Sequence, residues 1–146
     1  MSEARTPAED RKLIEEAITG YASYLDFREF DAFQRVFARD ATWNRAPIPT
    51  FGRPLHGAVE IRTMMEKHAR EAPADRVGRH LVNNVIFDEQ TAETARTRSY
   101  VTVLTVTTGA TPSIRLRGVG VYHDRFIRED GRWVIAERLF NVDYLD

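Results

Sequence analysis

The 146-residue sequence contains no cysteine, which excludes a disulfide framework, a thiol nucleophile and a thiolate metal site. No apolar run approaches the roughly 20 residues that a membrane-spanning helix needs. The N-terminal stretch MSEARTPAED lacks the apolar core of a secretory signal, so we expect a cytoplasmic protein. The net charge of −1 gives no electrostatic reason to expect nucleic acid or a membrane as a partner.

The length of the chain suits a single domain over residues 1–146. Thr6, Pro7 and Glu9 form a capping-box pattern, which predicts a helix that runs to about Leu25. The other predicted elements are a short helix after a second capping pattern at Asp26 and Glu29, a strand at 41–45, a loop at 46–54, a helix from Gly57 to about Ala72, and strands at 79–87, 92–106 and, as a hairpin with a turn at 128–131, 115–144. Helices followed by antiparallel strands predict an α+β domain with helices packed on one face of the sheet.

One face of the predicted C-terminal hairpin carries an unusual mixture of side chains. Strand alternation places on it Gly118, Gly120, Tyr122 and Asp124 from the first strand and Ala136, Arg138, Phe140 and Val142 from the second. Small, aromatic and charged groups together suit the wall of a cavity in a strongly bent sheet, and strand glycines mark bends or close approach. Arg138 needs either a ligand or an ion-pair partner, for which Asp124 is a candidate.

Three of the four histidines have ordinary explanations. His56 precedes a helix in a proline-rich segment and is expected to be exposed. His68 falls on the apolar stripe of the third helix, so we expect a core or boundary position, and His123 lies on the hairpin face opposite Tyr122. Their spacing matches no helix-borne metal motif, so we predict no metal.

His80 begins a predicted strand that is apolar on both faces. Alternation gives it the same face as Val82, Asn84 and Ile86, with Leu81, Val85 and Phe87 opposite. A buried imidazole needs a partner for its ring N–H, and a backbone carbonyl is one candidate. The carboxylate of Asp26 is another, although Asp26 also suits the role of helix cap. If Asp26 accepts the N–H of His80, it fixes the tautomer and makes the imidazole a better base.

The order of these motifs resembles the SnoaL-like branch of the nuclear-transport-factor-2-like superfamily over essentially the whole chain. The residues that carry the resemblance are Tyr21, Leu25-Asp26, Phe30-Asp31, Phe33, 37–43, Gly57, Ile61, His80, Asn84, 120–124 and 130–133. The resemblance implies a cone-shaped barrel, in which a curved and mostly antiparallel sheet encloses a pocket closed by N-terminal helices.

Within that superfamily, the chain is most similar to the enzymes with an Asp–His dyad, such as scytalone dehydratase, hexachlorocyclohexane dehydrochlorinase and bile-acid 7α-dehydratase. The resemblance implies catalytic roles for Asp26, His80, Tyr21 and Arg138. The substrate-binding residues that we assign to the same pocket are Trp43, Asn84, Tyr100, Tyr122 and Phe140. A second histidine of scytalone dehydratase is missing from residues 97–100, so we do not expect a scytalone-like substrate.

The predicted activity is a cofactor-independent, dehydratase-type elimination on a small, apolar and cyclic substrate, with His80 as general base oriented by Asp26. The alternatives are an isomerase or cyclase with the same dyad, a non-catalytic domain that binds a small ligand, and an epoxide hydrolase that uses Arg98, Asp124 and Arg138. The resemblance also implies a homo-oligomer, either a dimer or a trimer.

Overall fold

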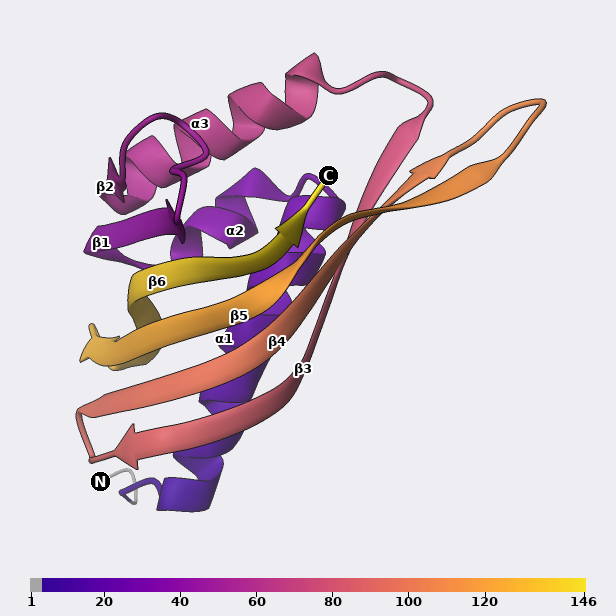
Figure 1. The fold of residues 1–146 in the computed structure, drawn as a ribbon. Coiled ribbons are helices and arrows are strands. Elements are labelled where there is room, and N and C mark those ends of the chain that lie inside the picture. The colour runs from indigo at the N-terminus through magenta and orange to yellow at the C-terminus, as the bar shows by residue number, and fades with distance from the viewer. Residues whose placement is uncertain (1–3) are drawn as a thin grey trace.

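The computed structural model describes residues 4–146 as three helices and a six-stranded sheet (Figure 1). The elements are α1 (Pro7–Asp26), α2 (Phe30–Arg35), β1 (Phe37–Ala46), β2 (Leu55–His56), α3 (Ala58–Glu71), β3 (Arg76–Gln90), β4 (Thr94–Thr107), β5 (Ser113–Glu129) and β6 (Arg132–Leu145). The strand order is β2-β1-β6-β5-β4-β3, and only β1 and β6 run parallel. The predicted α+β class is confirmed, with a mixed sheet that is open between its edge strands, β2 and β3.

The first helix lies across the inner face of the sheet and contacts β3 and β6 (Figure 1). Its N-terminus has the predicted capping box, in which Thr6 Oγ1 accepts the backbone N–H of Glu9 and Glu9 accepts that of Thr6. Ile14, Ile18 and Tyr21 are at most 1% exposed, so the apolar stripe of α1 forms the centre of the core. Within residues 4–146, no helix combines the length and apolarity of a bilayer-crossing segment.

The predicted cap of the second helix is wrong. Asp26 is the last residue of α1, and α2 begins at Phe30 with Glu29 as an N-cap that makes no side-chain hydrogen bond. The carboxylate of Asp26 instead accepts hydrogen bonds from His80 on β3. Asp26 therefore binds His80, which is distant in the sequence, and does not cap the helix that follows it.

The C-terminal hairpin turns through Asp130 and Gly131, which both have positive φ angles of 51° and 75°. Its register places Asp124 opposite Arg138 and Tyr122 opposite Phe140. The predicted close approach is present at Gly120, where a Cβ atom would lie 2.2 Å from the carbonyl oxygen of Asn141.

A β-bulge in β3 corrects the predicted strand faces. The pairing with β4 shifts between Asn83 and Ile86, and Asn84 adopts a positive φ of 53°. The extra residue reverses the alternation, so Val82 packs on the core before the bulge and Val85 and Phe87 do so after it. Asn84 and Ile86 are exposed and do not share the inner face with His80.

Candidate active site

The C-terminus of α1 and the start of β3 bring Asp26 and His80 together. Asp26 Oδ1 lies 2.6 Å from His80 Nδ1, and Asp26 Oδ2 accepts the backbone N–H of His80 at 2.8 Å. Gly78 lies beside the carboxylate, where a Cβ atom would make an ordinary contact of 3.9 Å with Asp26 Oδ1. The side chain of Asp26 is 7% exposed and that of His80 is 19% exposed, so the pair is shielded but accessible from one side.

The contact sets which nitrogen of His80 can react. A carboxylate accepts the Nδ1 proton, which leaves the lone pair of a neutral ring on Nε2. The second oxygen is held by the backbone of the same residue, so the carboxylate cannot turn away without breaking two hydrogen bonds. This arrangement can orient an imidazole as a general base.

A second polar group lies in the interior and is centred on Arg138. Its Nε and Nη2 atoms donate to the two carboxylate oxygens of Asp124 at 2.8 and 2.7 Å, and both side chains are fully buried. The guanidinium contacts the rings of Tyr21 and Tyr122, 4.1 and 4.0 Å from their centroids, and the two rings meet edge to face at 5.7 Å. Trp43 Nε1 donates to the hydroxyl of Tyr21 at 3.0 Å. The sequence left open whether Arg138 binds a ligand or an ion-pair partner, and the structure shows the ion pair with Asp124.

Burial controls the protonation of this interior group. It raises the pKa of Tyr21 and raises that of Tyr122 well above its usual value, so both phenols keep their protons at neutral pH. For Arg138, burial alone lowers the pKa, but the Asp124 carboxylate and the tyrosines outweigh it, and the pKa is raised. The cluster therefore contains a permanent cation and two hydroxyl donors.

Two glycines separate the Asp26–His80 pair from this cluster. On the inner face, His80 lies in one row with Val103 and Gly118, and the next row contains Gly120. The row after that contains Tyr122, with the ring of Phe140 beside it at 5.3 Å. The ring of Phe140 and the backbone of β6 pack closely against these glycines, since a Cβ atom on Gly120 would lie 2.8 Å from Phe140 Cε2 and 2.2 Å from the carbonyl oxygen of Asn141.

The structure brings five of the predicted substrate-site and catalytic residues into one interior cluster. They are Tyr21, Trp43, Tyr122, Arg138 and Phe140, all at most 7% exposed and packed on one another. Tyr100 is 56% exposed on the outer face, because Ser99 and Val101 on either side of it point inward. Together with Asn84, it lies outside the cluster.

The remaining histidines lie away from the cluster. His56 and His123 are exposed, as expected. His68 was expected in the core or at its boundary, but it is exposed on α3 and makes an edge contact with Phe51 at 6.2 Å. Across residues 4–146, no group of three or more ligating side chains is placed to hold a metal ion.

Sequence reasoning missed two residues of the interior group, Thr97 and Ser99. Both point inward from β4, and their hydroxyls are buried without a hydrogen-bond partner among the described residues, as is Nη1 of Arg138. The signal was the alternation of small residues, Ala95, Thr97 and Ser99, along a strand with charged and aromatic neighbours. A cavity of about 340 Å³ opens beside α1 and α2, and one of about 440 Å³ opens between α2 and α3; neither is lined by Asp26 or His80.

The arrangement of helices across an open, curved sheet is shared by many solved structures. A protein of unknown function with a cystatin-like fold from Nostoc punctiforme has a TM-score of 0.75 and 21% identity, with 95% of each chain covered. ActVI-ORFA from Streptomyces coelicolor has a TM-score of 0.75 and 20% identity, with 91% of this chain and 96% of that chain covered. A protein provisionally assigned as a scytalone dehydratase, from Novosphingobium aromaticivorans, has a TM-score of 0.73 and 20% identity, covering 95% of this chain and 87% of that chain.

These likenesses define the class of fold, a cystatin-like α+β domain. The sequence profile of the SnoaL-like domain matches residues 6–139. The chain therefore belongs to the SnoaL-like domain family. No curated protein matches the sequence significantly.

Proposed function

We propose that the protein is a cofactor-independent lyase that eliminates water or another small leaving group from a small, apolar, cyclic substrate. The observation that carries the proposal is the 2.6 Å contact between Asp26 Oδ1 and His80 Nδ1, with the second carboxylate oxygen held by the backbone N–H of His80. The carboxylate fixes the imidazole with Nε2 available as a general base.

The proposed reaction begins when His80 Nε2 removes a proton from a carbon next to a carbonyl group. The electron pair of the broken C–H bond forms an enolate. Its collapse forms a carbon–carbon double bond and breaks the bond to the leaving group on the neighbouring carbon. A hydroxide leaving group takes up the phenolic proton of Tyr21 or Tyr122 and departs as water, and the proton held by His80 then returns through solvent to that phenolate, which restores both groups.

The interior cluster supplies the complementary groups of the mechanism. Tyr21 and Tyr122 keep their protons at neutral pH and can donate to the enolate oxygen or the leaving group. Arg138 adds a positive charge in a site from which Trp43 and Phe140 exclude water. The substrate would lie between His80 and these groups and would displace the ring of Phe140, which packs against Gly120. Asn84 and Tyr100 take no part, because their side chains face away.

An isomerase or cyclase with the same pair is the second candidate, since the proton that His80 removes can return to another carbon or the enolate can attack a second carbonyl. The name of one structural neighbour, the provisionally assigned scytalone dehydratase, accords with the dehydration proposed first. An epoxide hydrolase is disfavoured, because Arg98 faces outward and pairs with Asp88, away from the Asp124–Arg138 pair.

The test is a panel of cyclic β-hydroxy ketones, monitored by the ultraviolet absorbance of the conjugated ketone that forms. We expect turnover by the parent, a loss of at least about 100-fold in His80→Ala, and no change in the matched control His123→Ala, since His123 is exposed on the opposite face. Equal rates in the parent and His80→Ala would exclude His80 as the base. Deuterium uptake from D₂O without elimination would favour the isomerase, and binding without either reaction would favour a ligand-binding domain.

We also propose that the protein is cytoplasmic and that it forms a dimer or trimer through the outer face of its sheet. Leu81 and Tyr100 support this proposal, since they expose 52% and 56% of their surface on that face. Light scattering of the parent and of Leu81→Glu tests it: we expect an oligomer that the charge dissociates, whereas a monomeric parent would contradict the proposal.

A further inference from the structure

A cavity of about 340 Å³ lies between α1, α2 and the turn that joins β5 to β6. Three arginines, Arg5, Arg35 and Arg132, contribute to its lining together with a single carboxylate, that of Glu16. These four side chains give the cavity a net charge of +2, whereas the whole chain carries −1. The cavity is therefore locally cationic on a weakly acidic protein.

Other arginines near the cavity form ion pairs with carboxylates. Arg39 pairs with Glu129 and Asp130, and Arg128 pairs with Asp10, close to the same turn. Within residues 4–146, by contrast, no carboxylate lies within ion-pair distance of Arg5, Arg35 or Arg132.

Two of these arginines are held over the cavity by contacts with main-chain oxygens. Arg5 Nη1 donates to the carbonyl of Gly131 at 3.4 Å, and Arg132 Nη1 donates to that of Arg35 at 3.3 Å. Long hydrogen bonds to neutral oxygens leave most of each guanidinium free to bind an anion.

The rest of the lining is mainly apolar, and its largest side chain, Trp133, is held by polar contacts. Trp133 is 6% exposed, its Nε1 donates to Asp10 at 2.9 Å, and Arg128 stacks 4.9 Å from its ring centroid. Leu13, Ala17, Tyr24 and Val36 complete this surface. A fixed indole beside aliphatic side chains suits the flat or apolar body of a small molecule.

We infer that this cavity is a binding site for a small amphipathic organic anion, whose anionic group contacts the guanidinium groups of Arg5, Arg35 and Arg132 and whose apolar body packs on Trp133. The volume falls at the lower end of the range for small-molecule sites. Arginine forks match the planar oxygens of a carboxylate, and they also bind sulfonate and phosphate groups. The site is separate from the Asp26–His80 pair, so it does not depend on the proposed catalysis.

The two tryptophans allow the site to be tested directly. Naphthalene-1-sulfonate is titrated into ¹⁵N-labelled protein, and the indole N–H signals of Trp43 and Trp133 are followed, with Trp133→Phe used to assign them. We expect a saturable shift of the Trp133 signal and none of the Trp43 signal, because Trp43 belongs to the interior cluster. A shift of Trp43 alone, or no saturable shift, would overturn the inference.

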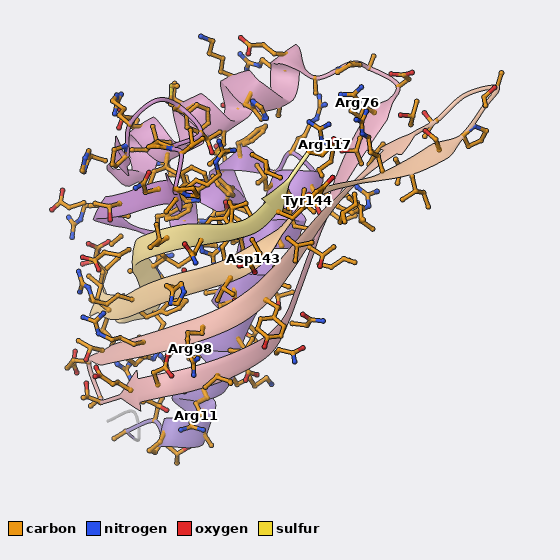
Figure 2. The ribbon with its side chains drawn as sticks, viewed as in Figure 1. Arg11, Arg76, Arg98, Arg117, Asp143 and Tyr144 are labelled. Carbon is orange, nitrogen blue, oxygen red and sulfur yellow. The ribbon has the colours of Figure 1, made fainter. Side chains whose placement is uncertain are left out.

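Charge dependence is tested with the double variant Arg35→Gln/Arg132→Gln. We expect its dissociation constant to rise at least about tenfold, since two charge-assisted contacts are lost. Arg76→Gln is the matched control and should bind as the parent does, because Arg76 is exposed at the start of β3, near the projecting β4–β5 hairpin (Figure 2). The uncharged analogue 1-naphthylmethanol should bind at least about tenfold more weakly. Unchanged affinity in the folded double variant, or equal affinity of the uncharged analogue, would refute the site.

Discussion

Removing Arg138 should destabilise the protein more than removing any exposed arginine. The Arg138→Met variant keeps much of the side-chain volume but leaves the carboxylate of Asp124 buried without its partner. Two hydrogen bonds, of 2.8 and 2.7 Å, are lost together with the cation–π contacts of the guanidinium with Tyr21 and Tyr122.

The expected loss follows from the burial of the pair. Breaking a fully buried ion pair by removing one partner costs about 3–5 kcal/mol, because an uncompensated charge remains in the interior. A domain of this size has a total stability of about 5–15 kcal/mol, so the variant should retain only a fraction of it. Replacing both partners, in Asp124→Leu/Arg138→Met, removes the unpaired charge and should recover most of the loss.

The double-mutant cycle consists of the parent, Arg138→Met, Asp124→Leu and the double variant. Urea denaturation of these four proteins measures the differences in their free energy of unfolding. Arg98→Met is the control, because the Arg98–Asp88 pair is 48% and 39% exposed and should contribute at most about 1 kcal/mol. If Arg138→Met lost no more free energy of unfolding than Arg98→Met, the reasoning about a desolvated pair would be refuted.

Three further perturbations test other parts of the fold. Gly120→Ala should cost about 1–3 kcal/mol in urea denaturation, since its Cβ would lie 2.2 Å from the carbonyl oxygen of Asn141; a neutral result would show that β6 can move. Thr6→Ala should cost about 0.5–2 kcal/mol by removing the capping box, and an unchanged midpoint would contradict that role. The pKa of Glu60 is lowered from 4.5 to about 2, mainly by the hydrogen bond from Arg53. The charged carboxylate therefore stabilises the fold above pH 4.5, and this contribution disappears as the pH falls towards 2. Thermal melts should therefore show Glu60→Gln to be less stable than the parent at pH 7 and equal to it near pH 2, and a constant difference would contradict the assignment.

Local signals predicted the elements of the fold well. The capping box at Thr6, the glycine before α3 and the Asp130–Gly131 turn are each specified by a few neighbouring residues, and all three are present. The alternation of β5 and β6 also placed Tyr122 and Arg138 correctly on the inner face. Such features depend on the conformational preferences of single residues, which the sequence states directly.

Long-range contacts were beyond the reach of the sequence pattern. The bulge at Asn84 leaves no clear sequence signal, yet it reverses every side chain that follows it. Asp26 satisfied the pattern of a helix cap, and its actual partner, His80, lies 54 residues further along the chain. The arginine cavity likewise assembles residues from both ends of the chain, so only the folded structure brings them together.

The tautomer of His80 tests the central claim most directly. Long-range ¹H–¹⁵N spectra of the neutral imidazole, recorded for the parent and for Asp26→Asn, distinguish a proton on Nδ1 from one on Nε2. The account predicts the Nδ1–H form in the parent, because Asp26 Oδ1 lies 2.6 Å from Nδ1, and a larger share of the Nε2–H form in the variant. A parent protein with its proton on Nε2 would contradict the account, because no lone pair would then face the substrate.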